Sequence, residues 1–249
     1  MAHSQATVRS EAPAIPVATV TLARSAEEQA LLERALKCLA DGRRVIAVAD
    51  GGSTPTFVDA IRTLPGTTIV PPDGDPGLLA QVKGSLRAAL DTGARAILYT
   101  EPDKEEFFSG ALDRFLRAGA SIDNAGIVVA ARSARSFATF PDTQRYTEGV
   151  INTLCGEYTG VPGDYSYGPF LVDRRLVPHV LAIADDVGWG WRPFVFAVAS
   201  RLGLRVELIE GDYLCPAGQR VDDAAERLHR IRQLEQNLKG LILSQAVKL

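Results

Sequence analysis

The sequence predicts a single α/β domain in which helices cover a mostly parallel β-sheet, with one long helix at its C-terminal end. Up to residue 131, short apolar segments alternate with helical segments of roughly 10–15 residues, an order typical of βαβ units. From Val221 onward, apolar residues recur at helical spacing over about 25 residues. A chain of 249 residues is long enough for one such domain with a sizeable core.

The composition is that of a globular protein, with 46% hydrophobic residues, 23% charged residues and a net charge of −3. Because basic residues are intermixed with acidic ones, the sequence argues against a nucleic-acid partner. Cys38, Cys155 and Cys215 lie far apart and form no CxxC pair, which fits a reducing compartment better than a disulfide framework or a zinc site. No apolar run approaches the ~18 residues of a membrane span, and no signal-peptide pattern is present. We therefore expect a cytoplasmic protein, with peripheral attachment to a membrane left open.

The first strand and helix are expected between Val17 and Gly42. Val17–Leu22 is a β-branched run typical of a strand. Ser25 and Glu28 follow at the spacing of a capping box, and leucines and alanines then recur at helical intervals. Gly42 suits the position just past the end of this helix.

The alternation continues through the first half of the chain. Val45–Ala49 is continuously apolar, as expected for a strand buried on both faces of a parallel sheet. Thr54 and Pro55 mark the start of the next helix, because proline is favoured in the first turn. The following predicted elements are strand 67–70, helix 78–90, strand 96–100, helix 105–118 and strand 126–131.

Beyond residue 132 the alternation ends. A polar stretch over 132–146 precedes a predicted helix over 147–158 and then a segment rich in glycine, proline and tyrosine. The remaining predicted elements are a strand closing that segment, helices 173–184 and 192–202, strand 204–209 and the long helix from Val221. The apolar face of the long helix fits a contact with its own domain and a contact with a second subunit equally well.

Acidic residues and glycines gather directly after the predicted strands, whereas the strands themselves carry almost none. The segments are Ala23-Arg24, Asp50–Thr54, Pro71–Asp75 and Glu101–Lys104. In open parallel sheets, ligands bind outside the carboxyl ends of the strands. We therefore expect these segments to lie along one edge of the sheet and to form a binding site.

The Asp50–Thr54 turn has two interpretations. It is either a tight turn with a helix cap, or a turn whose glycines let the backbone approach a nucleotide while Asp50 accepts hydrogen bonds from the base or ribose. It matches neither the P-loop spacing nor the GxGxxG fingerprint.

Glu101-Pro102-Asp103 is the sharper signal. Two carboxylates one residue apart in an extended chain point to the same side, and Pro102 stiffens the pair. Mg²⁺ and Mn²⁺ prefer such oxygen ligands, and Mg²⁺ commonly takes one or two carboxylates together with substrate phosphates. The alternative is that both acids only stabilise the positive N-terminal end of the next helix.

In this order the segments resemble the GT-A glycosyltransferase fold, and within it the family 2 and mannosylglycerate-synthase-like enzymes. Those proteins carry an Asp-Asp-Gly-Ser-Thr-type turn, then a Lys/Asn-Gly element, then an Asp-X-Asp motif. The matching residues are Asp50–Thr54, Lys83-Gly84 and Glu101–Asp103. Glu101 stands where the first motif aspartate is usual, and Gly51 replaces one acid of the turn.

The resemblance implies roles for individual residues. The expected nucleotide-binding residues are Ala23, Arg24, Asp50, Gly51, Lys83 and Glu101, and the expected metal ligand is Asp103. His229, which lies within the long predicted helix, is not counted as a ligand.

Residues 132–249 are expected to hold the acceptor. Asp185 and Asp186 precede a predicted helix, where inverting family 2 enzymes place a general base; the alternative is that they only end the preceding helix. Trp189 and Trp191 would form a platform for a sugar ring or pack in the core. Tyr167 and Gly168 are expected on another wall of the pocket.

We therefore expect a glycosyltransferase that moves a sugar from a nucleotide diphosphate sugar to a hydroxyl of a small or lipid-linked acceptor, assisted by Mg²⁺ or Mn²⁺. The expected parts are a flexible arm over 1–16, a nucleotide-sugar-binding half over 17–131 and an acceptor-binding half over 132–249, the last two in one compact domain. The two departures leave open a catalytically inactive binding protein of the same fold. A nucleotidyltransferase is the third alternative, although it would normally carry a basic glycine-rich loop after the first strand. The long helix would be the contact in a homo-oligomer.

Overall fold

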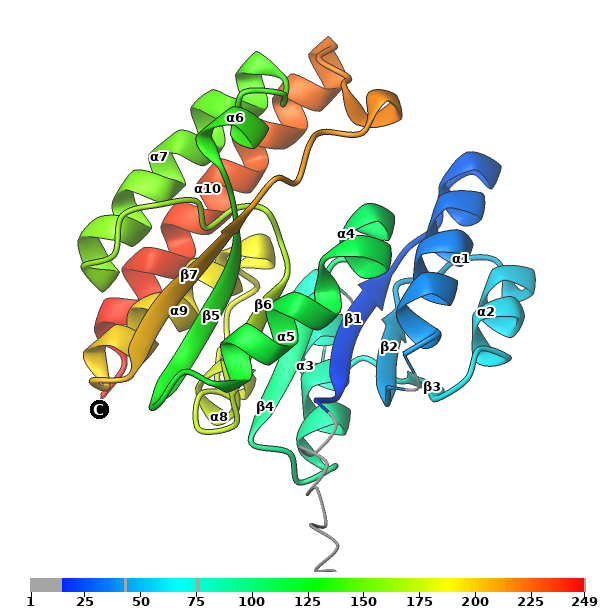
Figure 1. Cartoon of the computed structure of the whole chain (residues 1–249), viewed down its shortest axis with the longest axis horizontal. Helices are drawn as coiled ribbons and strands as arrows, with labels where there is room; N and C mark the ends of the chain where they lie inside the picture. The colour runs from blue at the N-terminus through cyan, green and yellow to red at the C-terminus, as the bar shows by residue number, and fades with distance from the viewer. Residues whose placement is uncertain (1–14, 43, 75–76, 249) are drawn as a thin grey trace, which may run out of the picture.

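The computed structural model describes residues 15–42, 44–74 and 77–248, and its centre is one seven-stranded sheet (Figure 1). The strands are β1 (Val17–Thr21), β2 (Ile46–Asp50), β3 (Thr67–Val70), β4 (Ala96–Thr100), β5 (Ala125–Arg132), β6 (Phe170–Asp173) and β7 (Arg205–Gly211). Their order across the sheet is β3-β2-β1-β4-β6-β5-β7. β6 runs antiparallel to β4 and β5, and the other pairs are parallel. The predicted α/β fold with a mostly parallel sheet is confirmed.

Helices cover both faces of this sheet because alternate residues of its strands point to opposite sides. In β4, Leu98 faces one core while Ile97 and Tyr99 face the other. The first core is closed by α1 (Ala26–Ala40), α2 (Pro55–Arg62), α4 (Glu105–Gly110) and α5 (Leu112–Ala120). The second is closed by α3 (Leu78–Leu90), α7 (Asp142–Thr159), α8 (Val177–Leu181), α9 (Trp191–Arg201) and α10 (Ala224–Ala246). Short helices α6 (Ala134–Phe137), η1 (Gly188–Gly190) and η2 (Ala217–Gln219) complete the described elements.

Several predicted boundaries need correction. The helix expected over 105–118 is two helices, α4 and α5, which meet at Ala111. The helix expected over 147–158 begins earlier, at Asp142, because Pro141 occupies its N-cap position. The helix expected over 173–184 is mostly wrong, since Asp173 ends β6 and only the five residues of α8 are helical. Of the arm expected over 1–16, residues 1–14 lie outside the described residues.

The long predicted C-terminal helix is α10, and it packs on its own domain. It lies beside α7 and α9 in Figure 1 and contacts both, as well as η1. The closest approach is between backbones: a Cβ added at Gly240 would lie 1.8 Å from the carbonyl oxygen of Gly190, and one added at Gly190 would lie 2.0 Å from that of Gln236. Glycine at these two positions is therefore what lets α10 reach η1.

Replacing Gly240 with alanine is expected to destabilise the protein by about 1–3 kcal/mol, because the new methyl group must push two backbones apart. Urea unfolding measures the change. Gly149→Ala in α7 is the matched control, since a Cβ there meets no atom within 4 Å. This control should gain about 0.5–1 kcal/mol from the better helix propensity of alanine. Equal stability of the two variants would contradict the close packing of α10 on η1.

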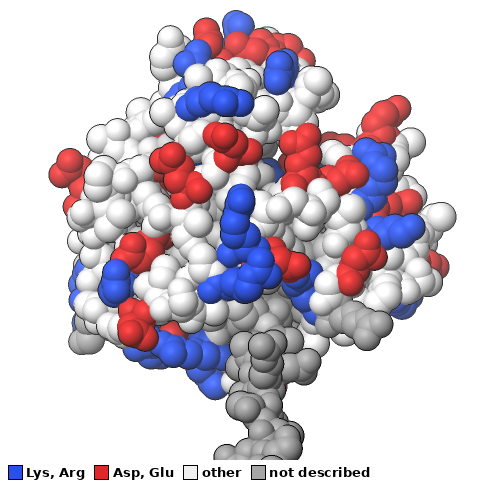
Figure 2. All heavy atoms as spheres, in the orientation of Figure 1, with Lys and Arg blue, Asp and Glu red and all other residues white. Residues whose placement is uncertain are grey.

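Figure 2 shows acidic and basic side chains intermixed over one face of the molecule, without an extended patch of either sign. Within the described residues, no helix combines the length and apolar character needed to cross a membrane.

Candidate functional site

A cavity of about 1000 Å³ opens at the carboxyl edge of the sheet. One wall comes from the segment after β1, from Gly51 after β2 and from the start of α3. The opposite wall comes from α7, the start of α9 and the first half of α10. Glu101 and Asp103, which follow β4, lie between the two walls. Of the turns predicted to share this edge, Arg24, Gly51 and the 101–104 segment line the cavity, whereas no residue of 71–74 does.

Each of the two acids has one carboxylate oxygen engaged and one without a hydrogen-bond donor. Arg192 Nη1 donates to Glu101 Oε1 at 2.8 Å, and Gln219 Nε2 donates to Asp103 Oδ2 at 3.4 Å. Glu101 Oε2 and Asp103 Oδ1 are buried and accept no hydrogen bond. Lys104 Nζ lies 3.0 Å from Asp103 Oδ1 as an ion pair. Buried oxygens left in this way have a strong preference for a cationic partner.

Carboxylate oxygens of this kind would be ligands for a divalent cation that completes its coordination from a bound ligand. In the described ranges, no group of three or more histidine, cysteine or acidic side chains is placed to hold a metal by itself. Mg²⁺ rarely needs one, because it usually combines one or two carboxylates with water and substrate phosphates. His229, left out by the sequence prediction, also lines the cavity. Partial burial lowers the pKa of this imidazole and so favours its neutral form at neutral pH.

Gly168 packs against Glu101 and does not line the cavity, so its predicted acceptor role has no support from the lining. Its φ of +133° is a backbone conformation that side-chain-bearing residues rarely adopt, and a Cβ there would lie 1.8 Å from Glu101 Oε2. Tyr167 does line the cavity and stacks on Tyr213, with ring centroids 4.5 Å apart. Burial, with the charge of Asp103 next, raises the pKa of the Tyr167 phenol, which therefore stays protonated.

The carboxylate of Asp50 holds its own turn together. It accepts hydrogen bonds from Thr21 Oγ1 at 2.8 Å, from the Gly52 and Ser53 amides at 2.9 and 2.8 Å, and from Ser53 Oγ at 2.6 Å. Asp50 is absent from the cavity lining, whereas Gly51 is part of it. The geometry thus agrees with the tight-turn interpretation of Asp50 and with a close backbone approach at Gly51.

Lys83 points away from the cavity and donates to the carbonyl oxygen of Ile183. Gln81 lines the cavity in its place, with its amide beside Gly51. Two residues along a helix are about 200° apart in direction, so Gln81 and Lys83 cannot face the same ligand. The predicted contact of Lys83 with the nucleotide therefore has no support from the cavity lining.

The remaining predicted residues divide between the cavity and its surroundings. Arg24 lines the cavity, whereas Ala23 is buried and its amide donates to Ser53 Oγ at 2.8 Å. Trp189 lines the cavity, but Trp191 is fully buried against Tyr99 and Phe170.

Asp185 and Asp186 are exposed and do not line the cavity. Asp186 instead accepts from the amide of Gly188 at 2.9 Å and stabilises the turn before η1. In this structure, the predicted roles of Trp191 as a platform and of the two aspartates as a base are not supported.

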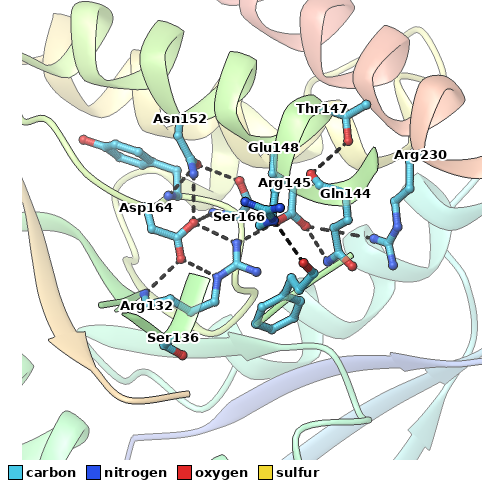
Figure 3. A network of polar contacts seen from close by, with 12 residues as sticks. Arg132, Ser136, Gln144, Arg145, Thr147, Glu148, Asn152, Asp164, Ser166 and Arg230 are labelled. Atoms are coloured by element: carbon cyan, nitrogen blue, oxygen red, sulfur yellow. Dashed lines mark hydrogen bonds and ion pairs between the residues drawn. The ribbon is translucent and has the colours of Figure 1, made fainter. Parts of the chain in front are cut away.

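A buried arginine that the sequence prediction missed, Arg132, also lines the cavity and lies at the centre of a polar network (Figure 3). Arg132 ends β5, is 1% exposed and forms two side-chain hydrogen bonds with Asp164, at 2.7 and 2.9 Å. Its Nη2 also donates to Glu148 Oε2 of α7 at 2.6 Å. Asn152 Nδ2 and the amide of Ser166 donate to Asp164 as well, at 3.0 and 3.1 Å. We call these five residues the Arg132 network.

The electrostatics of this network favour the charged forms. Burial by itself raises the pKa of Asp164, but the hydrogen bonds and charge of Arg132 lower it more, so the carboxyl ends below its usual value. Burial likewise opposes the charge on Arg132, and Glu148 and Asp164 more than offset it. The Arg132 guanidinium also lies over Phe140 and Phe137, 4.3 and 4.7 Å from their ring centroids. The network therefore fixes the start of α7 and the 164–167 segment, both of which line the cavity.

This fold, with its cavity and acid pair at the carboxyl edge, is that of the GT-A glycosyltransferases. Glucosyl-3-phosphoglycerate synthase of Mycobacterium tuberculosis superposes with a TM-score of 0.66 and 17% identity, over 95% of this chain and 82% of that one. Its complex with Mg²⁺ and uridine diphosphate gives a TM-score of 0.65 and 16% identity, over 95% and 80% of the two chains. Its complex with Mn²⁺, UDP-glucose and phosphoglyceric acid gives 0.66 and 16%, over 95% and 81%. No protein-family model and no curated protein matches the sequence.

Proposed function

We propose that this protein is a glycosyltransferase that moves a sugar from a nucleoside diphosphate sugar to a hydroxyl group of a small acceptor, with Mg²⁺ or Mn²⁺ bound next to Glu101 and Asp103. The observation that carries the proposal is the acid pair itself. Glu101 and Asp103 each carry one buried carboxylate oxygen without a hydrogen-bond donor, and both residues line a cavity large enough for a nucleotide sugar, at the edge of the sheet where ligands bind in such folds. The structural neighbours, which bind UDP-glucose with Mn²⁺, support the same chemistry.

The two walls of the cavity suit two different ligands. On the β1–α1 side, Leu22 and Gly51 offer an apolar surface and an accessible backbone, and Arg24 adds a positive charge. This wall is where we place the nucleoside. On the α7–α10 side, Gln144, Thr147 and Asn237 present amide and hydroxyl groups. Such groups hydrogen-bond to hydroxyls, so we place the sugar and its acceptor there.

The chain's own residues would position the donor and exclude water. A bound metal would offset the negative charge that develops on the departing diphosphate. Arg192 holds Glu101 Oε1 and also donates to the carbonyl of Tyr165 at 3.2 Å, which fixes the direction of the free Oε2. Tyr167 and Trp189 add aromatic surface to the cavity and limit the access of water to the reacting groups.

A thermal-shift titration of the full chain tests the donor assignment. UDP and GDP are each added with and without Mn²⁺, and nucleoside monophosphates serve as controls that lack the second phosphate. A diphosphate at 100 times its Kd should add about 2.7 kcal/mol of stability, and Mn²⁺ should strengthen this effect. Incubation of the matching sugar donor with polyol acceptors should then release nucleoside diphosphate.

Three outcomes would count against the proposal. Absence of any nucleoside diphosphate shift removes the donor site. Binding without sugar transfer to any acceptor would favour an inactive binding protein. Release of pyrophosphate from a nucleoside triphosphate would instead identify a nucleotidyltransferase.

A further inference from the structure

Lys104 is the only charged side chain in contact with the free oxygen of Asp103 among the described residues. Its ammonium lies 3.0 Å from Asp103 Oδ1, and the two side chains are 18% and 30% exposed. The geometry is that of an ion pair without a hydrogen bond, so the ammonium neutralises this oxygen without filling its acceptor position. The Lys104 ammonium thus places its positive charge beside Asp103, where a divalent cation bound to this carboxylate would place its own.

The surroundings of Lys104 confine the ammonium to the cavity. Its Nζ lies 5.5 Å from the centroid of the Tyr167 ring, and its Cε would be 3.2 Å from a Cβ on Gly168. Lys104 also lines the cavity that contains the acid pair. The stem is therefore held beside Gly168, and the charged end lies between the Tyr167 ring and Asp103.

We propose that Lys104 is a resident counter-cation that the metal displaces from Asp103 and that then binds the diphosphate of the donor. This inference rests on the proposed function of the same site. A divalent cation and an ammonium repel each other strongly when both lie against one carboxylate. A diphosphate supplies several negative oxygens, and lysine binds phosphate as a compact point charge. The lysine thus exchanges a carboxylate for a phosphate partner when metal and donor bind together.

The exchange predicts opposite effects of one substitution on two ligands. Lys104→Met removes the charge but keeps the length of the stem. Without nucleotide, the Kd for Mn²⁺, measured from the paramagnetic resonance signal of the free ion, should fall roughly 10-fold because a competing positive charge has gone. With Mn²⁺ saturating, the Kd for inorganic pyrophosphate, measured by calorimetry, should rise roughly 10-fold because a charged donor is lost.

Matched variants separate this role from a structural one. Lys104→Arg keeps the charge and should retain both wild-type affinities to within about 3-fold. Lys104→Gln is a second neutral variant and should show the same pair of opposed shifts as Lys104→Met. Lys239→Met removes an exposed lysine that pairs with Glu235 on α10 and should change neither affinity.

The outcomes distinguish this inference from the function on which it rests. Mn²⁺ binding that appears or strengthens in both neutral variants, together with weaker pyrophosphate binding, supports the exchange. Mn²⁺ affinity that is unchanged, reduced or unmeasurable in the variants overturns it, as does unchanged pyrophosphate affinity. If wild-type protein binds neither pyrophosphate nor nucleoside diphosphate with Mn²⁺, the proposed function itself fails.

Discussion

Asp103→Asn is expected to lower kcat/KM for sugar transfer by about 10³-fold, because metal stabilisation of a departing phosphate group is worth several kcal/mol. The substitution preserves the shape of the side chain and its contact with Gln219, but it replaces one charged oxygen by an amide. The oxygen that this change affects most is Oδ1, whose only charged neighbour among the described residues of the wild type is the Lys104 ammonium. Loss of Mn²⁺-dependent stabilisation by nucleoside diphosphate should accompany the loss of activity.

The control for Asp103 is Asp59→Asn on α2. Asp59 pairs with Arg62 on the surface, and its side chain is 70% exposed, so its replacement should leave transfer and Mn²⁺ binding unchanged. Full retention of both metal-dependent nucleotide binding and sugar transfer in Asp103→Asn would remove Asp103 from the site. Retention of binding with loss of transfer would place Asp103 in the chemical step without a role in holding the metal.

Arg132→Met should be the most destabilising single change in the protein outside the apolar core, at about 3–5 kcal/mol, because it leaves buried carboxylates without a counter-charge. Asp164 and Glu148, its two ion-pair partners, are 6% and 14% exposed. Denaturant unfolding measures the loss. Arg62→Met, which breaks the exposed Asp59 pair, should cost no more than about 1 kcal/mol.

Acid titration of stability gives this prediction a second readout with a definite sign. In the wild type the pKa of Asp164 is lowered, so its contribution is present above its unfolded pKa and is lost as the pH falls below that value. Without the Arg132 side chain, the strongest opposition to burial is lost and the pKa of Asp164 rises above its wild-type value, although Asn152 and backbone amides still donate to it. Arg132→Met should therefore recover stability as the pH falls from neutral toward the new pKa, where the wild type is unaffected. If the free energy of unfolding of the variant changes with pH in the same way as that of the wild type, the ionic role of the network is contradicted.

The parts of the fold that the sequence predicts are those set by local pattern. β2 and β4 are continuous apolar runs followed by acids or glycines, and both end at the cavity edge as expected. The prediction for the α8 region failed because Arg174 and Arg175 continue an apparently helical pattern. In the structure, Arg175 instead donates hydrogen bonds to Asp173 at the end of β6. Whether this segment forms a strand or a helix depends on the pairing of β6 with β4, and these two strands lie far apart in the sequence.

Residues of the site were predictable where a turn places them and unpredictable where a distant contact selects them. Glu101 and Asp103 follow a strand directly, and both line the cavity. Lys83 was assigned by resemblance, but helix geometry turns it away and brings Gln81 forward. The sequence carries one local indication that Arg132 is important, namely a charge at the end of an apolar strand. Its partners Glu148 and Asp164 lie 16 and 32 residues away, so the network itself could not be predicted.

The helix that packs on Gly190, α10, is also the last of the described elements to be synthesised. β7 ends at Gly211, so a nascent chain on the ribosome can pair all seven strands before α10 begins at Ala224. At that stage the sheet exists, but the part of the cavity lining that α10 contributes, between Glu226 and Asn237, is still missing. A chain truncated ahead of α10 should therefore keep a paired sheet and lose affinity for any ligand that contacts the α10 side chains.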